Sequence, residues 1–141
     1  MKHTSTEHIL ETLRTRGYRI TSARRAIVDA LETTSSPYTV QDIVARIHTA
    51  DQVSVYRLFK TLHEEGLLAT VPSKGETMYE LKGEHHHHIV CTACGHTTHI
   101  PCTTTRTFPT PSQHTFHTIT DHDVTFYGTC MSCATPTKKG Y

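Results

Sequence analysis

Two pairs of cysteines constrain this chain more than any other feature. Each pair has the spacing Cys-x-x-Cys, first at Cys91 and Cys94 and again at Cys130 and Cys133, with 35 residues between the pairs. A tight turn lets both thiolates of one pair approach a single ion, and two pairs complete a tetrahedral zinc site. Four sulfur ligands leave no open position, so the pattern predicts a structural zinc ion that couples metal binding to folding. The alternative interpretation is two unrelated or redox-active pairs.

The composition changes near residue 83. Residues 1–82 hold eleven of the fourteen Lys and Arg, whereas residues 83–141 hold all five cysteines and nine of the thirteen histidines. We therefore expect a basic domain at 1–82 and a metal-binding domain at 83–141. The net charge of +1 does not indicate a nucleic-acid binder, so any DNA-binding surface must come from the local placement of Arg and Lys.

The cellular location is predicted from the absence of membrane-spanning and secretion signals in the sequence. No apolar run approaches the roughly 20 residues that span a bilayer, and the first residues do not have the pattern of a secretory signal. We expect a cytoplasmic protein with no membrane partner, in which cysteines serve metals more readily than disulfides. The fifth cysteine, Cys102, belongs to neither pair and is interpreted as a bystander thiol.

Apolar periodicity in the first domain predicts helices followed by a hairpin. A first helix ends at Gly17, Thr21 caps a second one, and Thr39 with Asp42 resembles a capping box for a third. A fourth helix buries an apolar stripe and stops at Gly66. The stripe comprises Val55, Leu58, Phe59 and Leu62, and two short strands are expected at Leu67–Val71 and Thr77–Leu81. Helices followed by a two-stranded hairpin are the order of a winged helix.

The second domain is expected to contain strands at Ile89–Cys91, Thr97–Ile100 and Val124–Tyr127. The Thr-rich stretch from Thr103 to Ser112 has no clear period, and its two prolines make a long helix there unfavourable.

The fourth predicted helix carries a candidate DNA-reading face. If its apolar stripe faces the core, then Tyr56, Arg57 and Lys60 point outward near the start of the helix. A helix fits the major groove, where Arg can hold guanine with two hydrogen bonds. Residues Arg19, Arg24 and Arg25 are candidates for further phosphate or minor-groove contacts. The alternative is an ordinary solvated helix face.

Four consecutive histidines, His85 to His88, precede the first cysteine pair. In a strand, alternate side chains point to opposite faces, so His86 and His88 share one face while His85 and His87 share the other. One run can therefore supply two metal sites. The competing interpretations are a tag remnant and a solvated polar strand.

Taken together, these motifs resemble the ferric uptake regulator superfamily, which includes sensors of iron, zinc, manganese, nickel and peroxide. The resemblance runs from about residue 8 to 133 and rests on Gly17-Tyr-Arg-Ile-Thr21, Ser54-Val-Tyr-Arg57, Tyr79-Glu-Leu81, the histidine run joined to Cys91 and Cys94-Gly95, and His122 with Tyr127-Gly-Thr-Cys130. It implies an α+β fold, with an N-terminal winged helix-turn-helix domain followed by a small α/β dimerisation domain containing the four-cysteine zinc site.

The resemblance also implies roles for particular residues. Tyr56 and Arg57 match recognition-helix contacts, and Arg19 matches a basic residue that enters the minor groove. The implied sensing site contains Glu80, His86, His88 and His99. A further site in the dimerisation domain is implied for His85, His87 and His122.

The sequence departs from the family at two places. Many relatives take an additional histidine ligand from the position of Pro37. The helix that usually supplies an acidic ligand to the further site is replaced by the Thr- and Pro-rich segment, where His114 or His117 are candidate substitutes.

The expected function is a metal-dependent repressor of uptake genes that binds an AT-rich inverted repeat as a homodimer, with no small-molecule substrate. Its cofactors are a structural zinc ion and a second regulatory ion, Zn²⁺ or Fe²⁺, of which the four-histidine run favours zinc. Three alternatives remain: a zinc hydrolase with Glu80 as general base, a zinc-buffering module that does not bind DNA, and a metal-independent regulator with structural zinc only.

Overall fold

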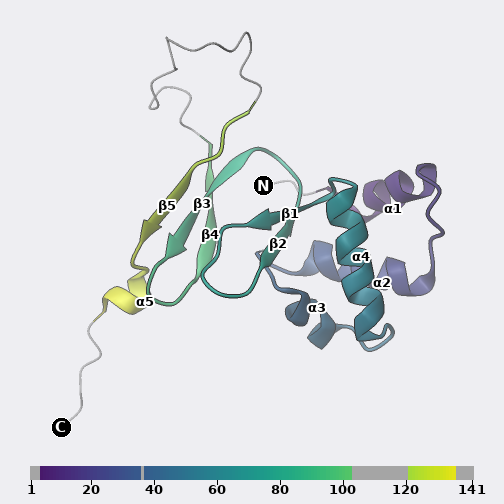
Figure 1. Cartoon of the computed structure of the whole chain (residues 1–141), viewed down its shortest axis with the longest axis horizontal. Coiled ribbons are helices and arrows are strands. Elements are labelled where there is room, and N and C mark those ends of the chain that lie inside the picture. Colours follow the sequence, from purple (N-terminus) through teal and green to yellow (C-terminus); the bar gives the residue numbers. More distant parts are fainter. Residues whose placement is uncertain (1–3, 36, 103–120, 136–141) are drawn as a thin grey trace. The chain divides into compact units, whose positions relative to one another are not determined.

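The chain divides into two units between Glu84 and His85, and each unit is described on its own. The computed structural model describes residues 4–35, 37–102 and 121–135 (Figure 1). The Thr-rich stretch and the candidates His114 and His117 lie outside these residues. No helix within the described ranges is long and apolar enough to cross a membrane.

The first unit consists of four helices followed by a hairpin, as the periodicity predicts. Its elements are α1 (Thr6–Thr15), α2 (Ser22–Thr33), α3 (Val40–Arg46), α4 (Gln52–Glu64), β1 (Leu68–Val71) and β2 (Met78–Leu81). The two strands are antiparallel, with Leu68 opposite Leu81. This arrangement is a winged helix, in which the hairpin is the wing.

Side-chain caps fix where the helices begin. Thr21 accepts a hydrogen bond from the backbone of Arg24, and Thr39 forms the predicted reciprocal capping box with Asp42. Asp51 caps α4 by accepting from the N–H of Ser54 at 2.9 Å. At the other end of α4, the chain turns away through Gly66, whose φ of 71° favours glycine.

The core of the first unit contains the apolar stripes that the sequence predicts. Ile9, Leu13, Ile27, Val55 and Leu62 are all fully buried. Burying a side chain of this size contributes about 1.5–3 kcal/mol, so this core dominates the stability of the unit. Edge-to-face contacts of Phe59 with Tyr38 and Tyr79 extend the core toward the hairpin.

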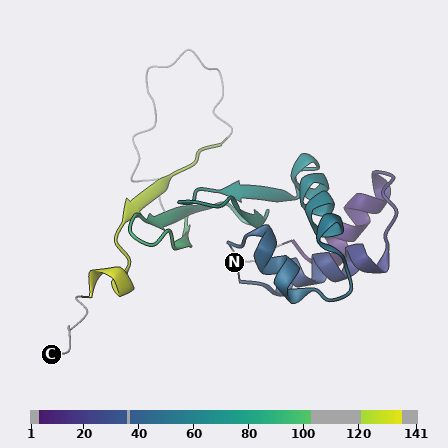
Figure 2. The same ribbon diagram turned by 60° about the horizontal axis from the view of Figure 1, so that its bottom comes forward.

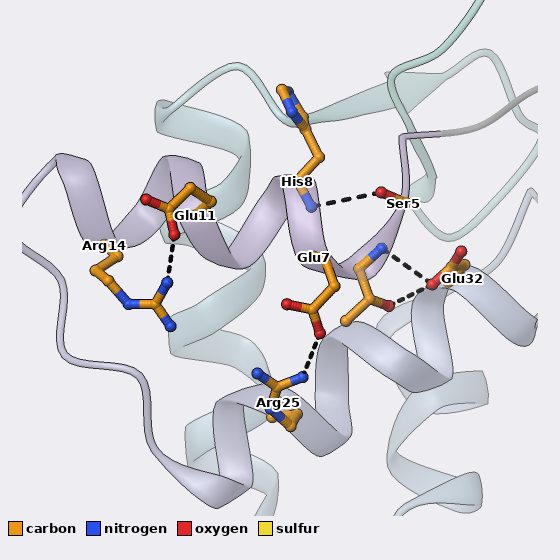
Figure 3. A network of polar contacts seen from close by, with 8 residues as sticks. Ser5, Glu7, His8, Glu11, Arg14, Arg25 and Glu32 are labelled. Atoms are coloured by element: carbon orange, nitrogen blue, oxygen red, sulfur yellow. Dashed lines mark hydrogen bonds and ion pairs between the residues drawn. The ribbon is translucent and has the colours of Figure 1, made fainter.

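Polar contacts join α1 to α2 at the rim of this core (Figure 3). Arg25 Nη1 lies 2.7 Å from Glu7 Oε1, and the backbone N–H of Thr6 donates to Glu32 Oε2 at 3.0 Å. The Thr6 hydroxyl donates to the same carboxylate oxygen. These two hydrogen bonds, first the one from the hydroxyl, hold the pKa of Glu32 below its ordinary value.

The second unit is a three-stranded sheet with a short helix. Its elements are β3 (His86–Cys91), β4 (Thr97–Pro101), β5 (Thr125–Gly128) and α5 (Met131–Ala134). The strand order is β4-β3-β5, and β3 is antiparallel to β4 but parallel to β5. Figure 2 shows α5 directly after β5. The three strands were predicted, whereas α5 is too short to leave a period in the sequence.

Candidate metal centres and nucleic-acid surface

The four paired cysteines come together at one end of the sheet. Cys91 ends β3, Cys94 follows in the next turn, and Cys130 and Cys133 lie at the start of α5 and within it. Their four Sγ atoms lie within 4.8 Å of one another. The Sγ atoms of Cys94 and Cys130 are 3.8 Å apart. Zinc–sulfur bonds of about 2.3 Å give a tetrahedron with edges of about 3.8 Å, so the residues fit a four-thiolate zinc ion.

Local hydrogen bonds prepare these sulfur atoms for a cation. The backbone N–H of Cys130 donates to Cys91 Sγ at 3.3 Å, and this bond is the main reason why the pKa of Cys91 falls to about 6. The pKa of Cys133 rises to about 12, first because its thiol donates to Cys130. Only part of the cluster therefore ionises readily by itself, and a divalent ion stabilises the remaining thiolates.

The histidines of β3 point alternately to the two faces of the sheet. On one face, His88 lies opposite His99 in the register of β3 and β4. The ring centroids of His86 and His99 are 4.5 Å apart, and the ligating nitrogens of the three histidines lie within 4.8 Å of one another. Three neutral imidazoles at this separation can hold a divalent transition metal.

The fourth predicted ligand of that face, Glu80, belongs to the first unit. It lies on β2 opposite Ala69. Tyr79, its neighbour in sequence, pairs with Tyr38, with N···O distances of 2.7 and 3.0 Å in the two directions. Pro37 thus precedes a residue that is bonded to the strand carrying Glu80.

On the other face, three ring nitrogens converge. His122 Nε2 lies 3.2 Å from His85 Nε2 and 3.2 Å from His87 Nε2. His87 is only 2% exposed. Its burial, and then the nearby His85 and His122, lower its pKa below the ordinary value, which favours the neutral form that binds metals.

Cys102, to which the sequence assigned no role, belongs to this second cluster. Its Sγ lies 3.4 Å from His122 Nε2. The Sγ atom and the ligand nitrogens of the three histidines all lie within 4.8 Å of one another. The alternation of side chains along a strand could have predicted this face for Cys102. Cys102 follows His99 by three residues, so it belongs on the opposite face of the sheet from His99.

Basic residues gather on a different surface, in the first unit. Arg19, Arg24 and Arg57 line one shallow pocket together with Ser54 at the start of α4. The Arg24 guanidinium donates to the backbone carbonyl of Arg19 and lies 5.9 Å from the ring centroid of Tyr18. These contacts hold Arg24 beside Arg19, and Arg57 of α4 lines the same pocket, so the three arginines can meet phosphates at one surface.

The other predicted DNA contacts lie along α4. Arg57 and Lys60 are exposed, and Tyr56 is 45% exposed with its hydroxyl accepting a hydrogen bond from Gln41 at 2.9 Å. Arg25 lies apart from the arginine pocket, because it pairs with Glu7. The sequence grouped Arg25 with Arg19 and Arg24, whereas the structure separates them.

A winged helix joined to a sheet with clustered thiols and imidazoles defines a class of metal-binding regulators. The model of the ferric uptake regulator family matches residues 15–127. The chain belongs to this family, whose members are metal-responsive transcriptional regulators.

Three relatives illustrate the similarity. The ferric uptake regulation protein of Neisseria meningitidis is 29% identical over 135 residues, covering 90% of this chain and 94% of that protein. The transcriptional regulator FurA of Mycobacterium tuberculosis is 29% identical over 132 residues, covering 88% of each. The structure of the Helicobacter pylori regulator Fur superimposes with a TM-score of 0.71 at 24% identity, covering 94% of this chain and 97% of that one. At this identity, the structural likeness shows the fold alone.

Proposed function

We propose that this protein is a homodimeric, metal-dependent repressor that binds an AT-rich inverted repeat and controls genes for metal uptake. The single observation that carries the DNA-binding part is the gathering of Arg19, Arg24 and Arg57 at the start of α4. In this proposal Arg57 and Tyr56 read the major groove, Lys60 contacts phosphate, and Arg19 enters a narrow AT-rich minor groove. The first unit is the DNA-binding domain, and the second binds metal and its partner subunit.

Exposed apolar side chains on the second unit support dimerisation. Phe126 and Tyr127 on β5 are 43% and 67% exposed, and Ile89 on β3 is 37% exposed. Large apolar groups on an outer strand of the described sheet favour association with a second copy. A twofold dimer presents two recognition helices to successive major grooves about 34 Å apart, which matches an inverted repeat.

The metal part of the proposal assigns a role to each cluster. Cys91, Cys94, Cys130 and Cys133 hold structural zinc, and His86, His88 and His99 with Glu80 hold the regulatory ion. His85, His87 and His122 belong to a further site. The H. pylori regulator is described as having three functional metal-binding sites, which is compatible with the three clusters among the described residues of this chain.

Regulation follows from ligands drawn from both units. A metal bound to the histidines of the second unit and to Glu80 of the first favours one relative arrangement of the units, and the dimer population shifts toward it. Three nitrogens and one oxygen suit tetrahedral zinc, so we favour zinc over iron as the sensed metal.

The test compares operator binding by the zinc-loaded protein before and after mild chelation that leaves one zinc ion per chain. We expect affinity for an AT-rich inverted repeat to fall at least tenfold on chelation and to recover when zinc is returned. Glu80→Gln should retain the structural zinc but weaken the recovery, while Glu84→Gln serves as a matched control. Competition between Zn²⁺ and Fe²⁺ during reloading ranks the two metals.

Other outcomes identify the alternatives. Equal affinity before and after chelation would indicate a metal-independent regulator with structural zinc only. No specific affinity for the operator in the zinc-loaded wild type, and no change in Arg57→Ala, would indicate a zinc-buffering module without DNA binding. Hydrolytic activity lost in Glu80→Gln would instead support an enzyme.

A further inference from the structure

We propose that Cys102 is a thiolate ligand of the second cluster, which thereby forms a three-nitrogen, one-sulfur site for a zinc-class cation. This inference deepens the proposed function, because it rests on the further site assigned there to His85, His87 and His122. His122 Nε2 lies at the centre of the contacts, 3.2 Å from His85 Nε2, 3.2 Å from His87 Nε2 and 3.4 Å from Cys102 Sγ.

Hydrogen bonding does not account for this convergence. A neutral imidazole nitrogen is either one N–H donor or one acceptor, so His122 Nε2 can make one good hydrogen bond. Three heavy atoms lie at contact distance from this nitrogen, so at least two of these three contacts are not hydrogen bonds. A cation at the centre of the four atoms would be coordinated by the three nitrogens and the sulfur at once, which explains why they converge.

The distances match the edges of a zinc tetrahedron. Zinc–nitrogen bonds of about 2.05 Å place two nitrogen ligands about 3.3 Å apart, and a nitrogen and a sulfur ligand about 3.6 Å apart. The observed N···N and S···N separations are 3.2 and 3.4 Å. All four ligand atoms lie within 4.8 Å of one another. The cluster is thus already close to the size that the ion requires.

The register of the sheet explains why these four residues meet. His86 pairs with Pro101 across β3 and β4, so one further step places His85 level with Cys102. His88 pairs with Thr125 across β3 and β5, and three steps back place His85 level with His122. His87 shares the face of His85. The register of the three strands therefore aligns His85, Cys102 and His122 side by side at one end of the sheet.

Asp121 lies beside two ligands of the cluster. Its Oδ1 lies 3.6 Å from Nδ1 of His85, on the ring edge away from the cluster, and accepts the backbone N–H of His122 at 2.8 Å. A carboxylate behind a ligating imidazole orients the ring and makes the ligand more basic. Asp121 thus bonds to the backbone of one ligand and lies near the ring of another.

A sulfur ligand determines which ions this site prefers. Thiolate selects zinc and similar soft or borderline ions, whereas a carboxylate in its place would favour harder ions such as Mn²⁺. We therefore assign to the second cluster a preference for Zn²⁺ or Co²⁺ over Mn²⁺.

Cobalt provides the direct test, because a Co²⁺–thiolate bond produces a charge-transfer absorption that Co²⁺–imidazole bonds do not. Protein that retains one tightly bound zinc ion per chain is titrated with Co²⁺. We expect a charge-transfer band in the wild type and its loss in Cys102→Ser, with zinc content and circular dichroism unchanged. No band in the wild type, or an equal band in Cys102→Ser, overturns the proposal.

Thiol protection gives a second measurement that does not depend on DNA binding. In the one-zinc protein, iodoacetamide should label Cys102, and added Zn²⁺ should slow that labelling at least tenfold. His122→Ala should abolish the protection, while His99→Ala, a matched change on the opposite face, should retain it. Protection that survives His122→Ala would show that Cys102 is shielded without being a ligand. Failure of operator binding would leave these readouts intact, so the two proposals fail separately.

Discussion

His87 and His88 are consecutive in the chain, yet their rings belong to different ligand clusters on opposite faces of one sheet. His88 is cross-strand partner to His99, while His87 Nε2 lies 3.2 Å from His122 Nε2. Two otherwise identical substitutions therefore test two separate sites.

We expect His88→Ala to remove the metal dependence of operator binding, leaving affinity at the level of the chelated wild type. His87→Ala should leave the cluster of His86, His88 and His99 able to bind its ion, because the lost ring lies on the other face. Fluorescence anisotropy with an operator duplex across a zinc titration measures both variants. An identical defect in the two variants would argue that the sheet has been disrupted, rather than one site.

Cys91→Ser should release the structural zinc and unfold the second unit. Structural zinc contributes apparent binding energies of about 10 kcal/mol or more, comparable to the whole stability of a small domain, about 5–15 kcal/mol. In protein that retains one zinc ion per chain, elemental analysis should show that this ion is lost, and the thermal transition of this unit should disappear. Ser132→Ala is the control, because Ser132 is an exposed neighbour of the cysteines in α5 and belongs to none of the ligand clusters. Full zinc retention in Cys91→Ser would contradict the four-thiolate assignment.

Arg57→Ala should weaken operator binding by about 1–3 kcal/mol, corresponding to a roughly 5- to 150-fold loss of affinity, and should relax base preference. Lys60→Ala should weaken binding to all sequences alike and reduce the slope of affinity against salt by about one ion. Arg14→Ala is a matched control, since Arg14 is exposed and pairs with Glu11. Comparable losses in Arg14→Ala and Arg57→Ala would point to bulk charge alone.

Thr39→Ala should destabilise the first unit by about 1 kcal/mol, because it removes the hydroxyl that accepts the backbone N–H of Asp42 and donates to the Asp42 carboxylate. Urea unfolding followed by circular dichroism measures the change. Thr33→Ala, at an exposed position at the end of α2, should alter stability far less. Equal effects would show that the capping box contributes little.

Thr6→Val should reduce the pH dependence of stability in the acid range. The Thr6 hydroxyl lowers the pKa of Glu32 from its ordinary value of 4.5, so the carboxylate stabilises the fold above that pH and ceases to do so as pH falls through the lowered value. The difference in free energy of unfolding between wild type and Thr6→Val should therefore be largest near neutrality and shrink below 4.5. Both proteins release zinc in acid, so this effect cancels in the difference between their free energies of unfolding. A difference that is constant with pH would assign the effect to packing.

Much of the first unit could be predicted from sequence, because its signals are local. The buried stripe of Val55, Leu58, Phe59 and Leu62 and the Thr39–Asp42 capping box depend on neighbours within one or two turns. The two histidine faces followed from strand alternation in the same way. Helix α5 was missed because four residues are too few to show a period.

The position of Cys102 depends on long-range geometry. Its alignment with His85 and His122 requires the pairing register of three strands, and one of these is parallel to β3 after a long excursion of the chain. Residue spacing alone does not determine such a register. The separation of Arg25 from Arg24 has a similar origin, since its partner Glu7 comes from a different helix.

Strand β3 and the residue before it supply ligand candidates to all three clusters: His85 and His87 to one, His86 and His88 to another, and Cys91 to the third. Insertion or deletion of a single residue between His88 and Cys91 would shift the histidines by one position and exchange the two faces. Such a one-residue change would disturb all three clusters of the described residues at once, whereas a single substitution affects at most the cluster to which its side chain belongs. We therefore expect a one-residue change in the length of β3 to impair metal binding more than most single substitutions along that strand.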